Sequence, residues 1–466
     1  MPDVIVVGGG PAGLAASRRL ATGGLSVTLL DEHVEPGGQY FRRPSPALLA
    51  QYGDHRPQGA RLIESVRSAG VEVRAGTTVW GVDDDGRSLL TTCGDSVDRL
   101  TAGVAVVLAT GAHERVLPFP GWQLPGVVTP GFAQHLAGEG VPVGNRVLVA
   151  GSGPFLLPVA CSLLRLGVEV VGVVEAGQPY RLSPRSLEML RFPARLRELA
   201  GYVSMLMRSR VPLRQGQVVM SAEADECGKV GSVTLAATDA PTVAGDQFDI
   251  DALCVGFGFR AQTELVQLLG CEVRLEPTSS DLLPVVDDQW RSSRPDVWII
   301  GEAARIAGVQ SALAAGERAA ESILHRDRPL RGSTRLRRRD RRIECFAQLT
   351  AGVYPAPAEL AQLLTRELPD CTQVCRCEGI DAAAIRAAAA QTTNRSALKA
   401  RTRAGMGLCQ GRECAPAVMA ISGAVGAETA RMPVRPVSLA ALASLPCTPV
   451  SPPPSDGELT ATAGAS

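Results

Sequence analysis

The stretch VIVVGGGPAGLAA, residues 4–16, decides the fold of this chain. Val4–Val7 is a short β-branched run, which is typical of a buried strand. The glycine-rich turn after it leads into a segment over residues 12–22 that favours a helix, and Gly23 and Gly24 end that helix. A second apolar run at residues 26–30 predicts the next strand. Strand, turn, helix and strand in this order predict a Rossmann-like βαβ unit.

The glycines of this turn satisfy the pattern G-x-G-x-x-G, which is typical of dinucleotide binding. In such turns the first glycine makes the tight bend, the second admits a pyrophosphate, and the third lets helix and strand pack closely. The positive end of the helix then faces the phosphates. We therefore expect the ligand to contact Gly8, Gly10, Pro11, Ala12 and Gly13. An acid at the end of the second strand can hold ribose hydroxyls; this is Asp31, with Glu32 as the alternative.

Three later strands favour FAD as the dinucleotide. The buried run that starts at residue 106 ends on Ala109, Thr110 and Gly111, and residues 251–260 repeat that shape. Residues 296–320 are a strand that ends on Gly301 and Glu302, followed by a helical segment. A carboxylate at Glu302 could accept hydrogen bonds from the ribityl hydroxyls of a flavin, and the helix would aim its positive end at the flavin ring.

A second unit, RVLVAGSGPFLLPVACSLLRLGVEVVGVVEA, residues 146–176, repeats the plan of the first. This self-similarity predicts a second Rossmann-like domain inserted into the first. Leu156 replaces the third glycine and is expected to push the helix away from the strand, while Pro158 removes a backbone donor from the helix. Whether NAD(P) or another nucleotide binds here stays open. The strand ends on Glu175, and no arginine pair follows it to favour NADP.

Four closely spaced cysteines lie near the end of the chain. They form Cys375-x-Cys377 and Cys409-x4-Cys414, with two predicted helices between the pairs, which Asp381 and Ser396 could cap. Basic side chains that could offset four thiolates crowd the same region: Arg376, Lys399, Arg401, Arg403 and Arg412. Zinc and [2Fe–2S] both accept four cysteines, and the tight Cys-x-Cys spacing is unusual for zinc. From the residues alone, a [2Fe–2S] cluster, zinc and a site without metal all remain open.

Composition limits the other classes of function. Lys and Arg together number 47, as do Asp and Glu, so the neutral chain gives no support to a nucleic-acid or anionic-membrane role. No apolar run reaches the roughly 18 residues of a membrane span. A strand within the first few residues leaves no room for a signal peptide, so we expect a cytoplasmic protein. In a reducing compartment the 12 cysteines are expected to be thiols or metal ligands rather than disulfides.

Catalytic side chains do not stand out. The chain has no Cys-x-x-Cys in its middle domain and no Cys-x4-Cys after the first helix, so it cannot run the dithiol chemistry of disulfide reductases with its own residues. His113 follows the Ala-Thr-Gly turn, but a structural role is favoured for it. We assign no catalytic acid or base, because a hydride acceptor needs position and electrostatics more than a general base.

The motifs resemble known families. The stretches at residues 106–122, 251–260 and 296–320 are similar to those of two-dinucleotide-domain flavoprotein oxidoreductases. In that family the position of Glu302 usually holds Asp. VCRCEGI, residues 374–380, and TRAGMGLCQGREC, residues 402–414, resemble the [2Fe–2S] domain of bacterioferritin-associated ferredoxin, over residues 370–425. The resemblance implies that Cys375, Cys377, Cys409 and Cys414 ligate a [2Fe–2S] cluster.

The whole layout narrows the resemblance. Three further motifs resemble those of α-type subunits of heteromeric amino-acid-oxidising flavoenzymes. They are PGGQYFRR, which contains Gly38 and Gln39, ATGAHERVLPFPGW and AGSGPFLLPVA. That group contains hydrogen cyanide synthase, opine oxidase and dye-linked proline or hydroxyproline dehydrogenases. The resemblance implies FAD contacts at Gly38 and Gln39. It also implies a relay of electrons to an acceptor, an amine site on a second, glycine-oxidase-like flavoprotein subunit, and room for a small ferredoxin-like subunit.

We therefore predict an α/β fold of nested Rossmann-like domains, as in two-dinucleotide-binding-domain flavoproteins, with a small helical [2Fe–2S] domain at the C-terminal end. The expected parts are an FAD-binding domain over 1–122 and 246–325, a second Rossmann-like domain over 123–245, an Arg-rich linker over 326–365, the cluster domain over 366–430 and a disordered tail over 447–466. Two other functions remain: a self-contained NAD(P)H-dependent reductase that passes electrons through the cluster, and a non-catalytic scaffold with a structural nucleotide and zinc.

Overall fold

A computed structural model describes residues 1–43, 57–83, 86, 88–179, 188–326, 334–424 and 430–444 of the chain. The predicted tail, residues 447–466, lies outside the described residues, and so do residues 327–333 of the predicted linker.

The first Rossmann-like domain is built on a five-stranded parallel sheet in the order β20-β7-β1-β2-β3. Its strands are β1 (Val4–Val7), β2 (Val27–Leu30), β3 (Glu72–Arg74), β7 (Ala105–Leu108) and β20 (Val297–Ile299). Helices on one side of it are α1 (Pro11–Thr22), α3 (Pro57–Ser68) and α9 (Val309–Leu324). The other side meets α8 (Glu264–Leu268) and the antiparallel strands β4 (Thr78–Val82), β5 (Ser88–Cys93) and β6 (Ser96–Thr101).

Alternation along β1 explains why this sheet is buried on both faces. Val4 and Val6 pack in the core formed with the three helices, while Ile5 and Val7 pack in the core on the opposite face. A continuous run of β-branched residues therefore serves two cores, as expected of a central strand in a parallel sheet. The expected strand, turn, helix and strand of residues 4–30 are all present.

The second Rossmann-like domain repeats this plan with a parallel sheet in the order β12-β11-β10-β16-β9. Its strands are β9 (Val127–Val128), β10 (Arg146–Gly151), β11 (Glu169–Glu175), β12 (Leu213–Gln215) and β16 (Ala252–Gly256). Its helices are α4 (Pro130–Gly138), α5 (Leu156–Arg165) and α7 (Pro193–Arg208), with the 3₁₀ turn η1 (Met189–Arg191) before α7. An antiparallel sheet of β13 (Gln217–Ala224), β14 (Val230–Ala237) and β15 (Gln247–Asp249) covers one side.

The boundary between the two domains differs from the prediction. Strand β16 pairs with β10 and β9 of the second sheet, although residues 246–256 were expected in the first domain. Leu117, Phe119 and Trp122 likewise pack in the second core. The run at 251–260 resembles the strand before Gly111 because both are strands of the same Rossmann plan, one in each domain.

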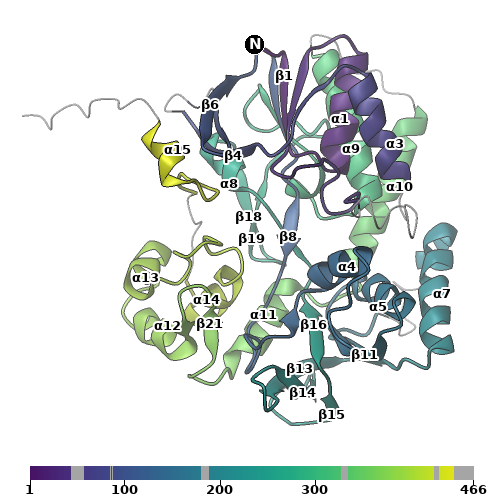
Figure 1. Ribbon diagram of the computed structural model, residues 1–466, viewed down its shortest axis with the longest axis vertical. Helices are drawn as coiled ribbons and strands as arrows, with labels where there is room; N and C mark the ends of the chain where they lie inside the picture. Colours follow the sequence, from purple (N-terminus) through teal and green to yellow (C-terminus); the bar gives the residue numbers. More distant parts are fainter. Residues whose placement is uncertain are drawn as a thin grey trace, which may run out of the picture.

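A pair of short antiparallel strands connects the two domains. They are β8 (Ala112–Glu114) and β17 (Phe259–Ala261), and Figure 1 shows β8 passing from the first domain toward the second. A hairpin of β18 (Val273–Glu276) and β19 (Asp281–Pro284) lies beside this pair, and the turn η2 (Gly301–Ala303) follows β20.

Residues 326–365, expected as a linker, contain two helices, α10 (Thr334–Ala351) and α11 (Pro357–Arg366). Leu360 and Ala361 of α11 are buried in the core of the second Rossmann-like domain. Helix α11 also packs against α14 (Ala415–Ser422), so it lies between two domains. The second half of the predicted linker is therefore a packed element of the fold.

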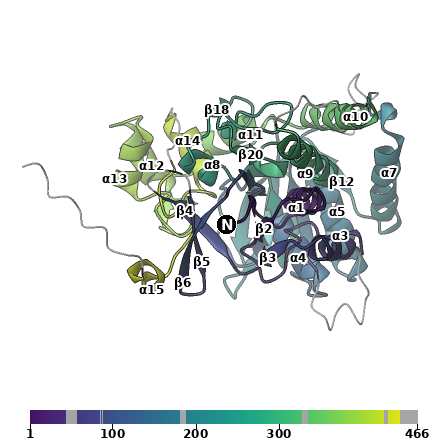
Figure 2. The ribbon, with the colours of Figure 1, turned by 90° about the horizontal axis from the view of Figure 1, so that it is seen from above.

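The cysteine domain, residues 368–424, is a small separate unit. It contains the strands β21 (Gln373–Cys375) and β22 (Ile380–Asp381) and, besides α14, the helices α12 (Ala382–Ala389) and α13 (Arg395–Thr402). Asp381 caps α12 as predicted, whereas Asn394 rather than Ser396 caps α13. Figures 1 and 2 show this domain on the opposite side of the molecule from α7 and α10.

Residues 430–444 return from the cysteine domain to the first Rossmann-like domain. The backbone N–H of Val434 donates to the carbonyl of Trp80 at 2.9 Å, and the Val434 side chain is buried beside β4. Ser438 begins the short helix α15 (Leu439–Ala443) and donates to Asp95 at 2.7 Å. The return segment therefore packs against the antiparallel strands of the first domain.

The described helices include none with both the length and the apolar character needed to cross a bilayer.

Candidate functional site

The glycine loop after β1 is built for close approach. Gly8 has φ of 104°, in the region that favours glycine. A Cβ on Gly13 would overlap the backbone oxygen of Gly8, so only glycine lets α1 pack this close to the loop. No side chain caps α1, and its first turn carries no acid, so its free N–H groups face no competing anion from that turn. Space for a ligand is open beside Gly10, where an added Cβ would meet nothing within 4 Å.

The acid predicted to hold ribose lies directly behind this loop. Asp31 is buried and accepts the N–H of Gly9 at 2.7 Å through one oxygen. Its other oxygen accepts the backbone N–H of His33 at 2.8 Å and lies 3.1 Å from the His33 ring, and this contact raises the pKa of His33. Glu32 is exposed and pairs with Arg435 at 3.2 Å. Asp31 therefore fixes the loop, and ribose binding by either acid stays a prediction.

Residues 36–39 lie against the glycine loop. Gly37 donates to the carbonyl of Gly9 at 2.8 Å, and a Cβ on Gly38 would lie 2.9 Å from the Cα of Gly10. Gln39 is exposed, so its side chain is free to reach a ligand at this loop. The predicted contacts Pro11 and Ala12 form the first turn of α1 on the other side of the loop.

The turn of Ala109, Thr110 and Gly111 joins β7 to β8 beside the same loop. Ala109 donates to Val7 at 2.8 Å, and Gly111 has φ of 74°. The hydroxyl of Thr110 donates to the carbonyl of Gln262 at 2.9 Å, and the N–H of Gln262 donates back to Gly111 at 3.0 Å. This turn is therefore held rigidly to the segment that follows β17.

Glu302 is a partly buried acid in the turn that follows β20. Gly301 has φ of 65°, and among the described residues the carboxylate of Glu302 accepts a single hydrogen bond, from the N–H of Gly308 at 3.3 Å. Burial raises the pKa of Glu302. A desolvated carboxylate with spare acceptor capacity in front of α9 fits a ligand that offers hydroxyls. With the glycine loop and the open end of α1, the first domain fits a flavin dinucleotide.

The second unit offers fewer donors to a phosphate. The buried carboxylate of Glu175 accepts the N–H groups of Gly153 at 2.9 Å and Gly177 at 3.0 Å. Helix α5 begins at Leu156, the third residue after Gly153, whereas α1 begins immediately after Gly10. The expectation that Pro158 costs α5 a donor is wrong, because Pro158 lies in the first turn, where N–H groups have no partner within the helix.

The four predicted cysteines gather in the cysteine domain. The Sγ atoms of Cys375 and Cys377 are 3.7 Å apart. A hydrogen bond with the Cys414 thiol, helped by backbone amides, lowers the pKa of Cys375 to about 5, and the same hydrogen bond raises the pKa of Cys414. Burial and the neighbouring Cys375 raise the pKa of Cys377 to about 11, and Cys409 is close enough to act on it as well.

These thiols fit a cluster shared by four sulfurs. Cys414 and Cys377 both act on Cys375, Cys409 acts on Cys377 and Cys414, and backbone amides are directed at Cys375. This arrangement suits a group that carries negative charge. A Cβ on Gly407 would overlap the sulfur of Cys377, so glycine there leaves room for the sulfurs.

The basic residues near the cysteines have separate roles. The guanidinium of Arg376 stacks over Trp122 of the second core at 4.9 Å, and Arg403 pairs with Glu378 at 2.9 Å. Arg412 is the residue that reaches the first domain. It lies between Cys409 and Cys414, and its guanidinium pairs with Glu264 at 2.9 Å and donates to the carbonyl of Val434 at 2.8 Å.

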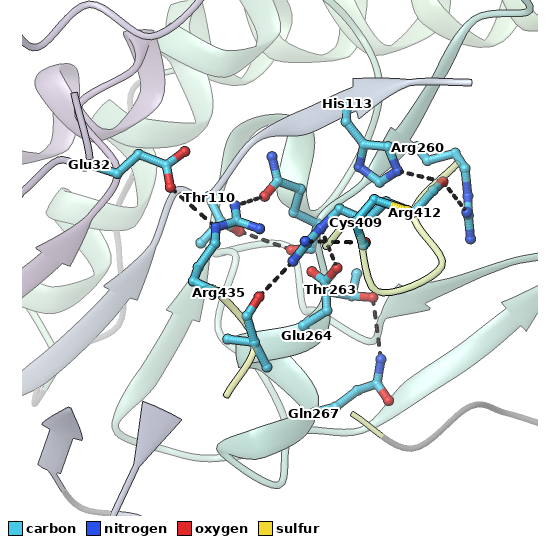
Figure 3. A network of polar contacts seen from close by, with 12 residues as sticks. Glu32, Thr110, His113, Arg260, Thr263, Glu264, Gln267, Cys409, Arg412 and Arg435 are labelled. Atoms are coloured by element: carbon cyan, nitrogen blue, oxygen red, sulfur yellow. Dashed lines mark hydrogen bonds and ion pairs between the residues drawn. The ribbon is translucent and has the colours of Figure 1, made fainter. Parts of the chain in front are cut away.

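The backbone carbonyl of Arg412 is held as well (Figure 3). It accepts the Nη1 of Arg260 at 3.0 Å and lies 3.2 Å from the Nε2 of His113. Burial and the nearby Arg260 lower the pKa of His113 to about 4, so the ring is neutral, and a proton on Nε2 makes it the donor. The loop between the last two cysteines therefore contacts β8, two residues after the Ala109–Gly111 turn.

A buried ion triad lies behind this contact. Asp281 pairs with Arg115, whose side chain is 1% exposed, and with Arg260 at 2.7 Å. Burial lowers the pKa of Arg115 to about 10. Sequence reasoning did not identify Arg260, Glu264 or Asp281, since they belong to no motif and approach Arg412 only through folding.

The geometry defines a class of protein: a flavoprotein of two dinucleotide folds with an added cluster-binding domain. Residues 2–318, more than half of the chain, match the family model "Pyridine nucleotide-disulphide oxidoreductase", and the chain belongs to that family. Residues 373–422 match the "BFD-like [2Fe-2S] binding domain". The predicted fold class is confirmed, and the protein is a flavin-dependent oxidoreductase with a [2Fe–2S]-binding domain.

Curated relatives define the branch of the family. The chain is 35% identical to the HcnB subunit of hydrogen cyanide synthase from Pseudomonas aeruginosa over 428 residues, which covers 88% of this chain and 90% of that protein. It is 32% identical to an opine oxidase subunit of Rhizobium meliloti, which covers 90% and 81% of the two chains. The fold is that of L-proline dehydrogenase from P. horikoshii, with a TM-score of 0.65 at 21% identity over 95% of this chain and 79% of that one. The predicted resemblance to this group is confirmed.

Proposed function

We propose that this chain is the electron-relaying subunit of a heteromeric flavoenzyme that oxidises an amino acid, an imino acid or an opine. One observation carries the proposal: the loop from Cys409 to Cys414 contacts β8 two residues beyond the predicted flavin-binding turn Ala109–Gly111. When bound, FAD exchanges two electrons and a [2Fe–2S] cluster exchanges one, so the pair converts between the two kinds of transfer.

The chain's own residues bind and orient these groups in the proposal. The loop of Gly8, Gly10 and Gly13 and the open end of α1 hold the dinucleotide phosphates, and Glu302 accepts its hydroxyls. The four cysteines hold the cluster. His113, which follows the flavin-binding turn, is neutral and contacts a backbone carbonyl, which suits a structural role.

The amine site is proposed to lie on a partner. The relatives are named as subunits of hydrogen cyanide synthase and opine oxidase, which supports the presence of a partner subunit. In the proposal this partner is a second, glycine-oxidase-like flavoprotein, with room for a small ferredoxin-like subunit. The test is to purify the chain together with its native partners, extract the cofactors and screen amino acids and opines with an artificial dye. Dye reduction by the complex supports the proposal; equal dye reduction by the isolated chain would place the amine site here.

A second candidate is a self-contained NAD(P)H-dependent reductase, which the second Rossmann-like sheet favours. The reduced number of free N–H groups near Gly153 argues for little or no nucleotide binding there. NADH added without oxygen distinguishes the two functions, because it bleaches the flavin of a reductase and leaves that of a relay subunit yellow.

The scaffold alternative is tested on the same preparation. An EPR spectrum after dithionite, with metal analysis, separates a reducible [2Fe–2S] cluster from zinc.

A further inference from the structure

We propose that His113 and Arg260 are positioning residues that hold the cluster loop, residues 409–414, by the backbone carbonyl of Arg412. This hold fixes the cluster against the flavin-binding turn and sets the charge around it. The inference rests on the proposed function, since it concerns the transfer of electrons between the two cofactors.

The held carbonyl is well placed for this role. It belongs to a loop of four residues between two cysteine ligands, so its displacement moves both Cys409 and Cys414. Arg260 at 3.0 Å and His113 at 3.2 Å can use both lone pairs of the oxygen. Two donors on one carbonyl restrict rotation of the peptide plane, which a single bond would permit.

Both donors belong to one rigid piece that begins in the first domain. Arg260 and His113 are directly opposite each other in the antiparallel pair β17 and β8. The two hydrogen bonds between the Thr110–Gly111 turn and Gln262 extend this strand pair by one step toward the flavin-binding turn. The flavin-binding turn and the two donors therefore keep a fixed separation.

A buried ion pair fixes the side chain of Arg260. The Nε of Arg260 donates to Asp281 at 2.7 Å, and Asp281 is itself held by the buried Arg115. An arginine anchored at Nε can present Nη1 with little loss of side-chain entropy. Removing either arginine would disturb the buried ion triad by leaving Asp281 with one cation instead of two, so the histidine is the better position for a test.

The return segment holds the loop from the other side. The Arg412 guanidinium pairs with Glu264 on α8 and donates to Val434, whose own N–H is bonded to Trp80. Arg435 bonds to Gln262 and pairs with Glu32 beside the glycine loop. Figure 3 shows Arg412 of the loop between His113 and Arg260 on one side and Glu264 and Arg435 on the other.

The charges around the carbonyl favour the reduced cluster. Arg412 belongs to the loop and is paired with Glu264, whereas the fixed group of Arg115, Arg260 and Asp281 carries a net positive charge beside the carbonyl. A net positive surrounding stabilises the more negative, reduced state of a cluster and raises its reduction potential. Loosening the loop from these groups should therefore shift the potential to a more negative value.

The test compares His113→Phe, which fills the space without a donor, with His113→Gln, which keeps an N–H donor. His135→Phe, on α4 outside the network, is the matched control. FAD and iron are quantified in the intact protein, the cluster potential is measured by EPR titration, and electron transfer to the cluster is followed after photoreduction of the flavin.

We expect His113→Phe to keep FAD and iron, to shift the cluster potential to a more negative value and to slow transfer by about tenfold or more, as for other outer-shell partners of metal sites. His113→Gln and His135→Phe should stay close to the unmodified protein. An unchanged potential and rate in His113→Phe would overturn the proposal. If that variant does not fold, hydrogen exchange in His113→Ala decides instead: greater exchange across residues 409–414 supports the hold, and unchanged exchange refutes it.

Failure of the proposed function gives a different result. Photoreduction needs no amine, partner or nicotinamide, so it tests the hold without the wider reaction. If the unmodified protein shows no transfer between flavin and cluster, the relay function fails, while the potential shift and the hydrogen exchange still report whether the loop is held.

Discussion

At the scale of single residues, Gly13 is the most demanding position of the glycine loop. A Cβ there would overlap the Gly8 oxygen, so Gly13→Ala must separate α1 from the loop. We expect FAD content to fall strongly and stability to drop by about 1–3 kcal/mol, the usual cost of overpacking. Gly138→Ala is the control, because its Cβ would meet nothing within 4 Å. Flavin absorbance and thermal unfolding measure both effects, and normal FAD content in Gly13→Ala would contradict this account.

Glu302 makes the stability of the folded protein depend on pH in a predictable direction. Burial raises its pKa, so the folded apoprotein binds this proton more tightly than the unfolded chain does. Its contribution to stability is therefore largest below the ordinary carboxyl pKa and is lost as pH rises through the raised value. Glu302→Gln should stabilise the FAD-free protein at neutral pH and have less effect at acid pH. Thermal unfolding across that range checks this; a stabilisation that is equal at every pH would contradict it.

The sequence motifs predicted the cofactor-binding loops, but not the contacts that hold the cysteine domain against the first domain. Gly8, Gly13 and the four cysteines follow spacings that chemistry imposes on a continuous stretch, so the sequence could predict them. Arg260 and Glu264 carry no such spacing, and the carbonyl of Arg412 is backbone, which no sequence pattern marks. The contact between the domains depends on these three groups, and only the folded chain brings them together.

At the scale of elements, α11 corrects the expected linker. The arginine-rich composition before it suggested a solvated segment, yet the apolar positions of α11 fall on one face, which packs into the second core. Leu360 is buried there, so Leu360→Ala should cost about 2–5 kcal/mol through lost burial and a cavity. The exposed neighbour Glu359→Ala should cost little. Denaturant unfolding compares them, and equal stabilities would mean that α11 does not support the core.

Helix α5 shows where a motif misleads at this scale. The sequence places Leu156 where α1 has its third glycine, which predicted a helix displaced from its strand. In the structure α5 begins at Leu156, and the Leu156 side chain is buried in the core between α5 and the second sheet. The helix therefore begins later after its glycine turn than α1 does. Pro158 is compatible with this later start, because it falls in the first turn of α5, where proline is tolerated.

At the scale of the whole molecule, the two cofactor sites have separate cores joined by few contacts. The core under the glycine loop is formed by β1, α1, α3 and α9, whereas the cysteine domain has a small core around Val374, Ile385 and Ala417. The sequence predicted these two units. It did not predict that residues 430–444 return to the first domain, because that segment has no periodic pattern and gains its place from single contacts such as Val434.

Separate cores predict that the cofactors can be lost separately. Cys409→Ser removes one predicted cluster ligand and leaves the glycine loop, Asp31 and Glu302 untouched, so iron and labile sulfide should be lost while FAD stays bound. Cys371→Ser is the matched control, because that thiol is exposed and lies only four residues before Cys375. Iron, sulfide and flavin are quantified in both proteins. Loss of FAD together with iron in Cys409→Ser would show that the cysteine domain is needed to form the flavin site, and full iron content would remove Cys409 from the ligands.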